Sequence, residues 1–202
     1  MSFAFTLIAA YLLGSLPTGY LTARRLKGVD VRTLGSGNIG ATNVARVIGK
    51  RAGLFVLLVD TVKGTLAVTL LPTLMAQLAG AEAPAHWRLW SGLAVVIGHD
   101  WCCWLYFRGG KGIATSLGVL LGLAPAIAGW CAVAWFLTFA LSRLVALSSI
   151  VASVALPLSL LALRYPGRWV LVGSLLGCIA IMRHNTNIKR MLQKTEQKFT
   201  PS

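Results

Sequence analysis

The chain has 202 residues, 56% of them hydrophobic and only 12% charged, whereas charged residues make up about a quarter of a soluble domain. Together with a mean hydropathy of +0.74, this composition excludes a disordered chain, a collagen-like fibre and an ordinary soluble enzyme. It predicts an all-α integral membrane protein, because one membrane-spanning helix takes about 20 residues and about six or seven of them nearly fill the chain.

Basic residues strongly outnumber acidic ones: 19 Lys and Arg against 5 Asp and Glu give a formal charge of +14. In a soluble protein this excess would indicate nucleic-acid binding, which is not expected here. Cytoplasmic loops of membrane proteins collect Lys and Arg, and a basic face also suits anionic headgroups and phosphorylated substrates. The four cysteines show no CxxC or zinc spacing, so we expect reduced thiols that pack within the membrane.

The first predicted span covers residues 2–23 and is broken at Gly14 and Pro17. No basic residue precedes it and a basic cluster follows at 24–27, so we expect it to enter from outside and to stay uncleaved. Later apolar runs predict spans at 54–80, 89–107, 144–163 and 169–182.

The run at 112–142 carries no charge and has Gly122 and Pro125 near its middle. As one helix it would be about 46 Å long, against about 30 Å of hydrocarbon, so it is either one kinked helix or two short helices joined by a tight turn. Two helices place 15 of the 18 loop Lys and Arg residues on one side of the membrane, whereas one helix places only 11 there. We therefore expect seven transmembrane helices, with the N-terminus outside and the C-terminus in the cytoplasm.

This topology makes four segments cytoplasmic, at 24–53, 108–115, 142–149 and 183–202. These segments contain nearly every unusual polar residue, whereas the outer loops look like plain connectors. We therefore expect the chemistry on one face of the membrane.

The first cytoplasmic segment contains LGSGNIGATNVAR at 34–46. Its glycines, which allow backbone N–H groups to converge on an anion, are Gly35, Gly37 and Gly40. Its neutral hydrogen-bonding side chains are Ser36, Asn38, Thr42 and Asn43. Arg46 adds a forked donor that suits phosphate. The alternative is a glycine-rich turn followed by a helix cap, but the full combination favours a phosphate site.

The second segment reads RGGKGIAT at 108–115 and opens a new helix. Gly109, Gly110 and Gly112 permit close backbone approach, the helix N-terminus favours an anion, and Lys111 supplies a point charge. The spacing is not that of a Walker A loop. The alternative is an ordinary basic turn at the membrane edge.

The third and fourth segments carry weaker signals. Ser149 lies near a predicted helix start, where serines are usually caps. His184 and Asn187 are three residues apart at the end of the last span, so on a helix they share a face. His184 suits phosphate binding or proton transfer, although an interfacial His is often without function.

Polar groups also occur within the predicted spans. Asp60 and Lys63 lie on one face of a helix and most simply neutralise each other, with a direct catalytic role as the alternative. His99 and Asp100 lie deeper than the second segment but near it, and His99 suits orienting a loop and accepting a proton equally well.

Several catalytic patterns are absent from the sequence. There is no HxxxxD acyltransferase motif, because Trp104 stands five residues after His99. Paired aspartates for CDP-alcohol phosphotransfer, a Ser-His-Asp set and a metal-ligand cluster are missing as well. We expect no covalent enzyme intermediate, metal or cofactor. An anion transporter would need polar residues along a path through the membrane, and another headgroup transferase would need the missing acids, so both are weaker hypotheses.

Seven motifs follow one another along nearly the whole chain: GSLPTGYL at 14–21, GSGNIGATNVAR at 35–46, DTVKG at 60–64, GH at 98–99, RGGKGIAT at 108–115, SRLVALSSI at 142–150 and HNTNIKRMLQKTEQKF at 184–199. In this order they resemble the acyl-phosphate:glycerol-3-phosphate acyltransferase family (PlsY type) of bacterial inner membranes. The chain departs from the family pattern at Ala146, where Ser is common, and at Asn185 and Lys194, where Arg and Gly are common.

The resemblance implies transfer of a fatty acyl group from acyl phosphate to the 1-hydroxyl of sn-glycerol 3-phosphate, giving lysophosphatidic acid and inorganic phosphate. It implies one domain over residues 1–202, surrounded by membrane lipids, with the soluble enzyme that makes acyl phosphate as a partner. The base is left open between the donor phosphate and His184. From the motifs and patterns together, the expected catalytic residues are Ser36, Arg46, Lys111 and His184. The expected substrate-binding residues are Gly37, Asn38, Gly40, Thr42, Asn43, Gly109, Gly110, Gly112, Ser149 and Asn187.

Overall fold

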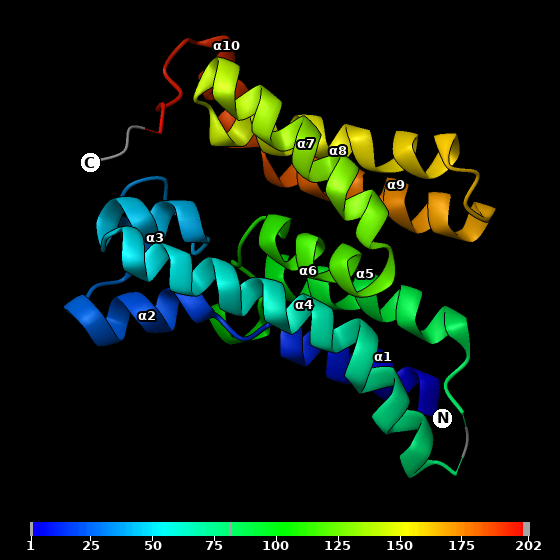
Figure 1. Cartoon of the computed structure of the whole chain (residues 1–202). Helices are drawn as coiled ribbons and strands as arrows, with labels where there is room; N and C mark the ends of the chain where they lie inside the picture. The colour runs from blue at the N-terminus through cyan, green and yellow to red at the C-terminus, as the bar shows by residue number, and fades with distance from the viewer. Residues whose placement is uncertain (1, 81, 200–202) are drawn as a thin grey trace. The chain divides into compact units, whose positions relative to one another are not determined.

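The computed structural model describes residues 2–80 and 82–199, and within these ranges all regular secondary structure is helical. The chain divides into two compact units, Met1–Leu123 and Ala124–Ser202. The first unit contains α1 (Ser2–Gly14), α2 (Thr18–Lys27), α3 (Ala41–Val47), α4 (Lys50–Leu78), α5 (Ala85–Asp100) and α6 (Ile113–Leu123) (Figure 1). The second contains α7 (Pro125–Ser142), α8 (Val145–Ala162), α9 (Gly167–Arg183) and α10 (Asn185–Leu192).

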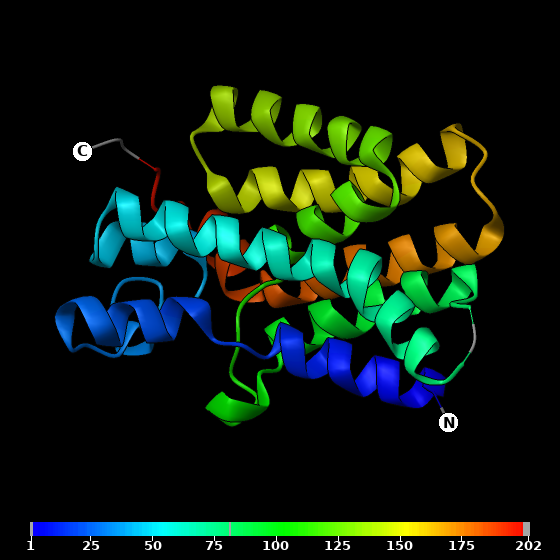
Figure 2. The ribbon, with the colours of Figure 1, turned by 60° about the horizontal axis from the view of Figure 1, so that its bottom comes forward.

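The first apolar run is broken where the sequence predicts, between α1 and α2 (Figure 2). Pro17 cannot donate a backbone hydrogen bond to continue α1. Gly14 also lies against the backbone of α5, since a Cβ built on it would clash with the Val95 carbonyl oxygen. Gly98 on α5 lies in the same way against Tyr11 of α1. These two glycines let α1 and α5 approach at backbone distance.

The long helix α4 and the shorter α6 are packed through small residues. A Cβ on Gly64 of α4 would clash with the Thr115 carbonyl oxygen, and one on Gly118 of α6 would clash with the Thr61 carbonyl oxygen. Backbone therefore meets backbone along this pair of helices, which is the usual way that membrane helices pack closely. The start of α6, just after residues 108–112, is fixed against the middle of α4.

The third predicted span is shorter than the apolar run suggests. The prediction extends a helix to residue 107, but α5 ends at Asp100. A turn and a 3-10 helix at Cys103–Leu105 follow, and Tyr106 and Phe107 have φ values of 55° and 60°. The carbonyl oxygens of His99 and Asp100 accept N–H groups from the glycines of the next loop, so the chain folds back here. The WCCW residues at 101–104 therefore lie outside the helix, not inside a span.

The uncharged run at 112–142 forms two helices, which confirms the two-helix interpretation. The first, α6, ends at Leu123, and α7 begins at Pro125, where proline is favoured because the first turn of a helix needs no internal N–H donor. In the second unit α8 packs against both α7 and α9. The last helix, α10, is short and follows α9 after one residue, His184.

Four described helical stretches are long and apolar enough to cross a membrane: Phe3–Lys27, Lys50–Leu78, Pro125–Ser142 and Val145–Ala162. Large apolar side chains also lie on the outer surfaces of the helices, with Leu78 75% and Leu141 90% exposed. In water such surfaces would be unfavourable, whereas lipid accommodates them. The number of seven spans and their orientation stay a prediction.

Candidate active site

The glycine-rich loop at 34–40 is held by the side chain of Asn43, which is 1% exposed. Its Oδ1 accepts the Ser36 N–H at 2.8 Å. Its Nδ2 donates to the carbonyl oxygens of Val31, Leu34 and Asn38 at 3.1, 3.1 and 2.8 Å. One buried amide thus hydrogen-bonds to four backbone groups that lie outside the α-helices. These contacts show how Asn43 shapes the loop, and its binding of substrate stays a prediction.

The entrance to this loop is anchored by an ion pair between Asp30 and Arg32. The Arg32 guanidinium donates to both carboxylate oxygens of Asp30, with the shortest contact at 2.7 Å. This hydrogen bonding holds the pKa of the Asp30 carboxyl below its usual range. Arg32 also lies over the ring of Tyr20, 5.0 Å from its centre. Arg32 therefore connects the start of the loop to Tyr20 of α2.

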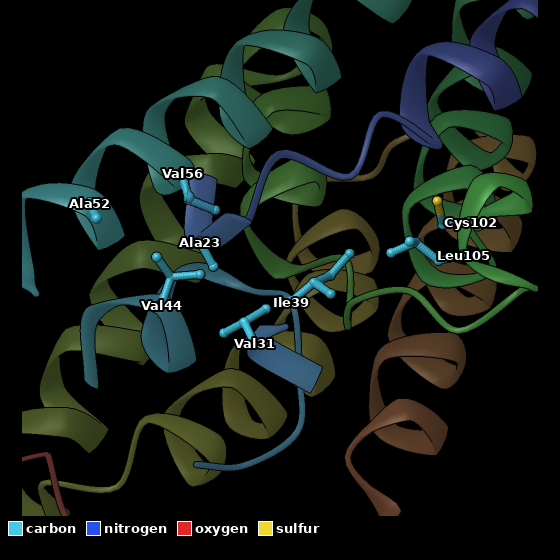
Figure 3. Close-up of a cluster of buried hydrophobic side chains, with 8 residues drawn as sticks. All are labelled: Ala23, Val31, Ile39, Val44, Ala52, Val56, Cys102 and Leu105. Carbon is cyan, nitrogen blue, oxygen red and sulfur yellow. The ribbon is translucent and has the colours of Figure 1, made fainter. Parts of the chain in front are cut away.

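A cluster of buried apolar side chains joins the first two polar segments (Figure 3). Its members are Ala23, Val31, Ile39, Val44, Ala52, Val56, Cys102 and Leu105. Ile39 comes from the middle of loop 34–40, while Cys102 and Leu105 come just before residues 108–112. The fold of the first unit thus brings loop 34–40 and the residues just before loop 108–112 to one hydrophobic core, although Ile39 and Cys102 are 63 positions apart in sequence.

The loop RGGKG at 108–112 is folded over the end of α5. The N–H groups of Gly109 and Gly110 donate to the carbonyl oxygens of Asp100 and His99, at 3.2 and 2.9 Å. Gly110 lies against the His99 ring, because a Cβ on it would clash with Nε2. Gly112 has a φ of 68° and lies beside the Asp100 carboxylate. Side chains at these positions would not fit, so the glycines are needed for close approach.

The predicted residues of the first unit differ in exposure. Half-buried positions are Ser36, Asn38, Gly40, Thr42, Arg46 and Lys111. Gly37 is exposed, whereas Asn43, Gly109, Gly110 and Gly112 are buried. Ordered but partly accessible polar groups are what a site for a small polar substrate requires.

Asp60 and Lys63 form the ion pair that their spacing predicts, at 2.8 Å between Oδ1 and Nζ. Each side chain is 3% exposed or less. Lys63 Nζ also lies 2.9 Å from His99 Nδ1, and Thr18 Oγ1 donates to Asp60 Oδ1 at 3.1 Å. The ion pair is therefore in contact with His99, which is predicted from the sequence to lie near loop 108–112.

In the second unit, the third and fourth polar segments are side by side. The Phe199 N–H donates to the Arg143 carbonyl oxygen at 2.9 Å, and its ring contacts that of Phe139. Ser149 is buried, accepts the Trp135 Nε1–H at 3.3 Å and donates to the Val145 carbonyl oxygen. Its hydroxyl therefore takes part in helix packing, and substrate binding by Ser149 stays a prediction.

His184 and Asn187 are both buried, at 3% and 4% exposure. They are not on one continuous helix, because α9 ends at Arg183 and α10 begins at Asn185. His184 Nδ1 lies 2.7 Å from the Ala180 carbonyl oxygen. A carbonyl oxygen only accepts, so Nδ1 carries a hydrogen and Nε2 is the nitrogen that can take a proton.

Glu196 is a residue that the sequence reasoning missed. Its carboxylate accepts from Asn187 Nδ2 and from Arg190 Nε, both at 2.7 Å, and its side chain is 6% exposed. It thereby orients the amide of a predicted site residue. A signal was available, since Glu196 is the only acidic residue in the basic segment at 183–202.

Comparison with known proteins decides the family. The family model for glycerol-3-phosphate acyltransferase matches residues 4–194. The glycerol-3-phosphate acyltransferase of Gloeobacter violaceus is 48% identical over 192 residues, covering 95% of this chain and 92% of that protein. That of Desulforudis audaxviator is 44% identical over 191 residues, with 95% and 92% covered. The chain belongs to the glycerol-3-phosphate acyltransferase family.

Two solved structures support the assignment at the level of fold. Both are of PlsY, an integral membrane glycerol 3-phosphate acyltransferase. Its glycerol 3-phosphate form is 38% identical to this chain, with a TM-score of 0.88, and covers 99% of this chain and 96% of the other. Its lysophosphatidic acid form is 37% identical, with a TM-score of 0.85 and the same coverage.

The family assignment agrees with the residue chemistry. The glycerol-3-phosphate acyltransferase match runs through both units and includes all the predicted site residues. Among residues 2–80 and 82–199, no three His, Cys, Asp or Glu side chains gather as ligands for a metal ion. All four cysteines are free thiols, but Cys102 and Cys103 lie in the turn after α5 and not within a span as predicted.

Proposed function

We propose that the chain transfers a fatty acyl group from acyl phosphate to the 1-hydroxyl of sn-glycerol 3-phosphate. The hydroxyl oxygen bonds to the acyl carbon, the acyl–phosphate bond breaks, and lysophosphatidic acid and inorganic phosphate leave. The family assignment supports the acceptor and the product class. The sequence resemblance to the acyl-phosphate-dependent family supports the donor.

The observation that carries the proposal is the pairing of two glycine-rich loops on one core of the first unit. Loop 34–40 contributes Ile39 to the buried cluster, and Leu105, three residues before loop 108–112, belongs to the same cluster. A basic residue lies in the helix after the first loop, Arg46, and within the second loop, Lys111. Both substrates carry phosphate. The N–H groups of Ser36, Gly109 and Gly110 already donate within the protein, so we assign anion binding mainly to the side chains of these loops, together with Arg46 and Lys111. Two substrates with similar headgroups call for two such loops.

We assign roles by charge and hydrogen-bonding capacity. Arg46 and Lys111 of the first unit are assigned to binding the phosphate of glycerol 3-phosphate. His184 of the second unit is assigned the same role from its chemistry alone. Residues 37–42, with Ser36, and residues 109–112 cradle the donor phosphate and stabilise the developing oxyanion, where one donor contributes about 3 kcal/mol. Ser149 and Asn187 complete the set of binding residues. Holding two anions together supplies much of the remaining rate enhancement.

Proton removal from the acceptor hydroxyl has two candidates. Phosphate is a good leaving group, so the attacking hydroxyl needs little activation, and the donor phosphate can take the proton itself. The alternative is His184, whose Nδ1 hydrogen bond to Ala180 leaves Nε2 as the basic nitrogen.

The proposed enzyme is a single domain over residues 1–202 with seven spans in the bacterial inner membrane. Its N-terminus is outside and its polar segments face the cytoplasm, where glycerol 3-phosphate and a soluble enzyme that makes acyl phosphate are available. The charge distribution among the loops supports this orientation.

The deciding experiment uses detergent-purified full-length protein. It is incubated with acyl phosphate and glycerol 3-phosphate, phosphate release is measured, and the lipid product is identified by mass spectrometry. We expect phosphate and lysophosphatidic acid in equal amounts, and no acyl transfer when glycerol 3-phosphate is left out. Product formation from acyl-CoA but not from acyl phosphate would contradict the donor assignment. Movement of glycerol 3-phosphate across liposomes without acyl transfer would instead favour a transporter.

A further inference from the structure

We propose that the buried Asp60–Lys63 pair acts through His99 as a positioning device for loop 108–112. This inference rests on the proposed function, because the loop is the proposed cradle for the donor phosphate. It gives a specific task to three buried polar residues that contact no substrate in the proposed scheme.

The ammonium group of Lys63 fixes which nitrogen of His99 carries the hydrogen. Lys63 Nζ has three acceptors around it: Asp60 Oδ1 at 2.8 Å, His99 Nδ1 at 2.9 Å and the Leu16 carbonyl oxygen at 3.2 Å. An ammonium has three donors and no acceptor. Nδ1 of His99 is therefore an acceptor without a hydrogen, and the ring is neutral with its hydrogen on Nε2.

His99 contacts loop 108–112 with both its backbone and its ring. Its carbonyl oxygen accepts the Gly110 N–H at 2.9 Å, and its Nε2 edge lies against Gly110 where a side chain would stand. Lys111 is the next residue. A rotation of the His99 ring would therefore displace the backbone that carries Lys111, a proposed phosphate-binding residue.

The surroundings leave the network little freedom. Asp60, Lys63 and His99 are 2%, 2% and 5% exposed. Gly64, next to Lys63, lies against Thr115 at the start of α6, so both ends of the loop region are fixed to α4 and α5. Placing ionised groups in a membrane helix is costly, and an apolar pair would pack there at lower cost. A functional task explains why charged residues occupy these positions.

The competing explanation is that Asp60 and Lys63 merely neutralise each other. A double variant separates the two explanations, because Asp60→Asn with Lys63→Met removes both charges together. The variant Lys63→Met alone leaves a buried carboxylate without its ion pair and is expected to lower the thermal midpoint as well as the activity. Ser91→Ala is the matched control, since it removes a buried hydroxyl from α5 outside the network.

We expect the double variant to keep a thermal midpoint close to wild type while kcat falls by about a hundredfold, the effect of misplacing a reacting group by about 1 Å. The KM values for both substrates should change much less than kcat. Ser91→Ala should keep the wild-type kcat. A double variant that regains both stability and the wild-type kcat would overturn the proposal in favour of simple neutralisation.

A second measurement does not depend on activity. Nitrogen-15 NMR of histidine-labelled wild-type protein reports which ring nitrogen is protonated, and comparison with His99→Gln assigns the signal. We expect the Nε2–H form for His99, with Nδ1 unprotonated. An Nδ1–H form or an imidazolium at neutral pH would overturn the proposal. If the wild type failed to transfer acyl groups, the proposed function would fall, while this spectrum would still decide the state of the network.

Discussion

Single side chains, more than secondary structure, determine the shape of the predicted phosphate loops. Asn43 holds loop 34–40 through four backbone partners, and Glu196 orients Asn187 and Arg190. Asn43 fixes the backbone of a loop, and Glu196 fixes two neighbouring side chains. Their roles depend on how each loop folds back on residues 5 to 12 positions away, which a sequence pattern does not contain.

Replacing Asn43 by Ala should destabilise the loop. It leaves the Ser36 N–H without its acceptor and removes the Asn43 hydrogen bonds to three carbonyl oxygens, of which those of Val31 and Leu34 keep a backbone N–H partner. The cost is about 3 kcal/mol, because each lost hydrogen bond contributes about 1 kcal/mol. We expect a lower thermal midpoint and a strong loss of phosphate release. Thr33→Ala, which removes one exposed hydroxyl from the same region, should change the midpoint only slightly. Equal midpoints for the two variants would contradict the assigned role.

Removing the proposed phosphate-binding cations should abolish most turnover. Arg46→Ala and Lys111→Ala each delete a charged donor assigned to the phosphate of glycerol 3-phosphate, so the acceptor hydroxyl is no longer held in place for attack. Steady-state rates of phosphate release from purified protein provide the measurement. Wild-type rates from either variant would refute its place in the site.

The variant His184→Gln separates the two candidates for the base. Gln retains hydrogen-bonding groups but cannot take a proton at neutral pH. If the donor phosphate is the base, kcat should be largely retained while KM for glycerol 3-phosphate rises. A kcat reduced by at least about a hundredfold, with little change in KM, would instead identify His184 as the base.

At the scale of elements, apolar runs and helix breakers predict most helices, including the interruptions at Gly14–Pro17 and before Pro125. The end of α5 was not predictable in the same way. Residues 101–107 are as apolar as a span, and what stops the helix is the hydrogen bonding of Gly109 and Gly110 to its last carbonyl oxygens. That contact arises from the tertiary fold. The helix break at His184 likewise has no proline or glycine to mark it.

The end of α10 provides a test at this scale. Lys194 has a φ of 57°, and the Thr195 N–H returns to the Arg190 carbonyl oxygen, an arrangement that favours glycine. Lys194→Gly should therefore stabilise the protein by about 0.5–1 kcal/mol, seen as a higher thermal midpoint in detergent. Lys189→Gly, within the same helix, should lower the midpoint, because glycine costs about 1 kcal/mol in a helix interior. A fall with both variants would contradict the argument.

At the scale of the whole molecule, the loop charges predict the orientation and the motifs predict the family. The family is shown by the comparisons, whereas the orientation depends on the distribution of Lys and Arg alone. The close packing of α4 against α6 was not predicted, because it depends on small residues such as Gly64 and Gly118, whose partners are distant in sequence.

Membrane topology can be tested by labelling single cysteines in a variant without the four native ones. Because Gly110 does not accept a side chain, the exposed position Arg108 is used to report on loop 108–112, as Arg108→Cys. The variant Lys198→Cys reports on the C-terminal segment, and Glu82→Cys reports on a predicted outer loop. A membrane-impermeant maleimide applied to intact cells with a permeabilised outer membrane should label only the Glu82→Cys protein. Labelling that separates residues 108 and 198 onto opposite sides would contradict the seven-span topology.

The contact between α4 and α6 has a consequence for the acyl chain. Because Gly64 and Gly118 bring the backbones of α4 and α6 into contact, no hydrocarbon tail can enter from the bilayer between these two helices. A substrate delivered from the lipid phase must come in past some other pair of helices. A larger residue at either position would push α4 and α6 apart. The two positions at which lipid is excluded therefore tolerate hardly any amino acid other than glycine.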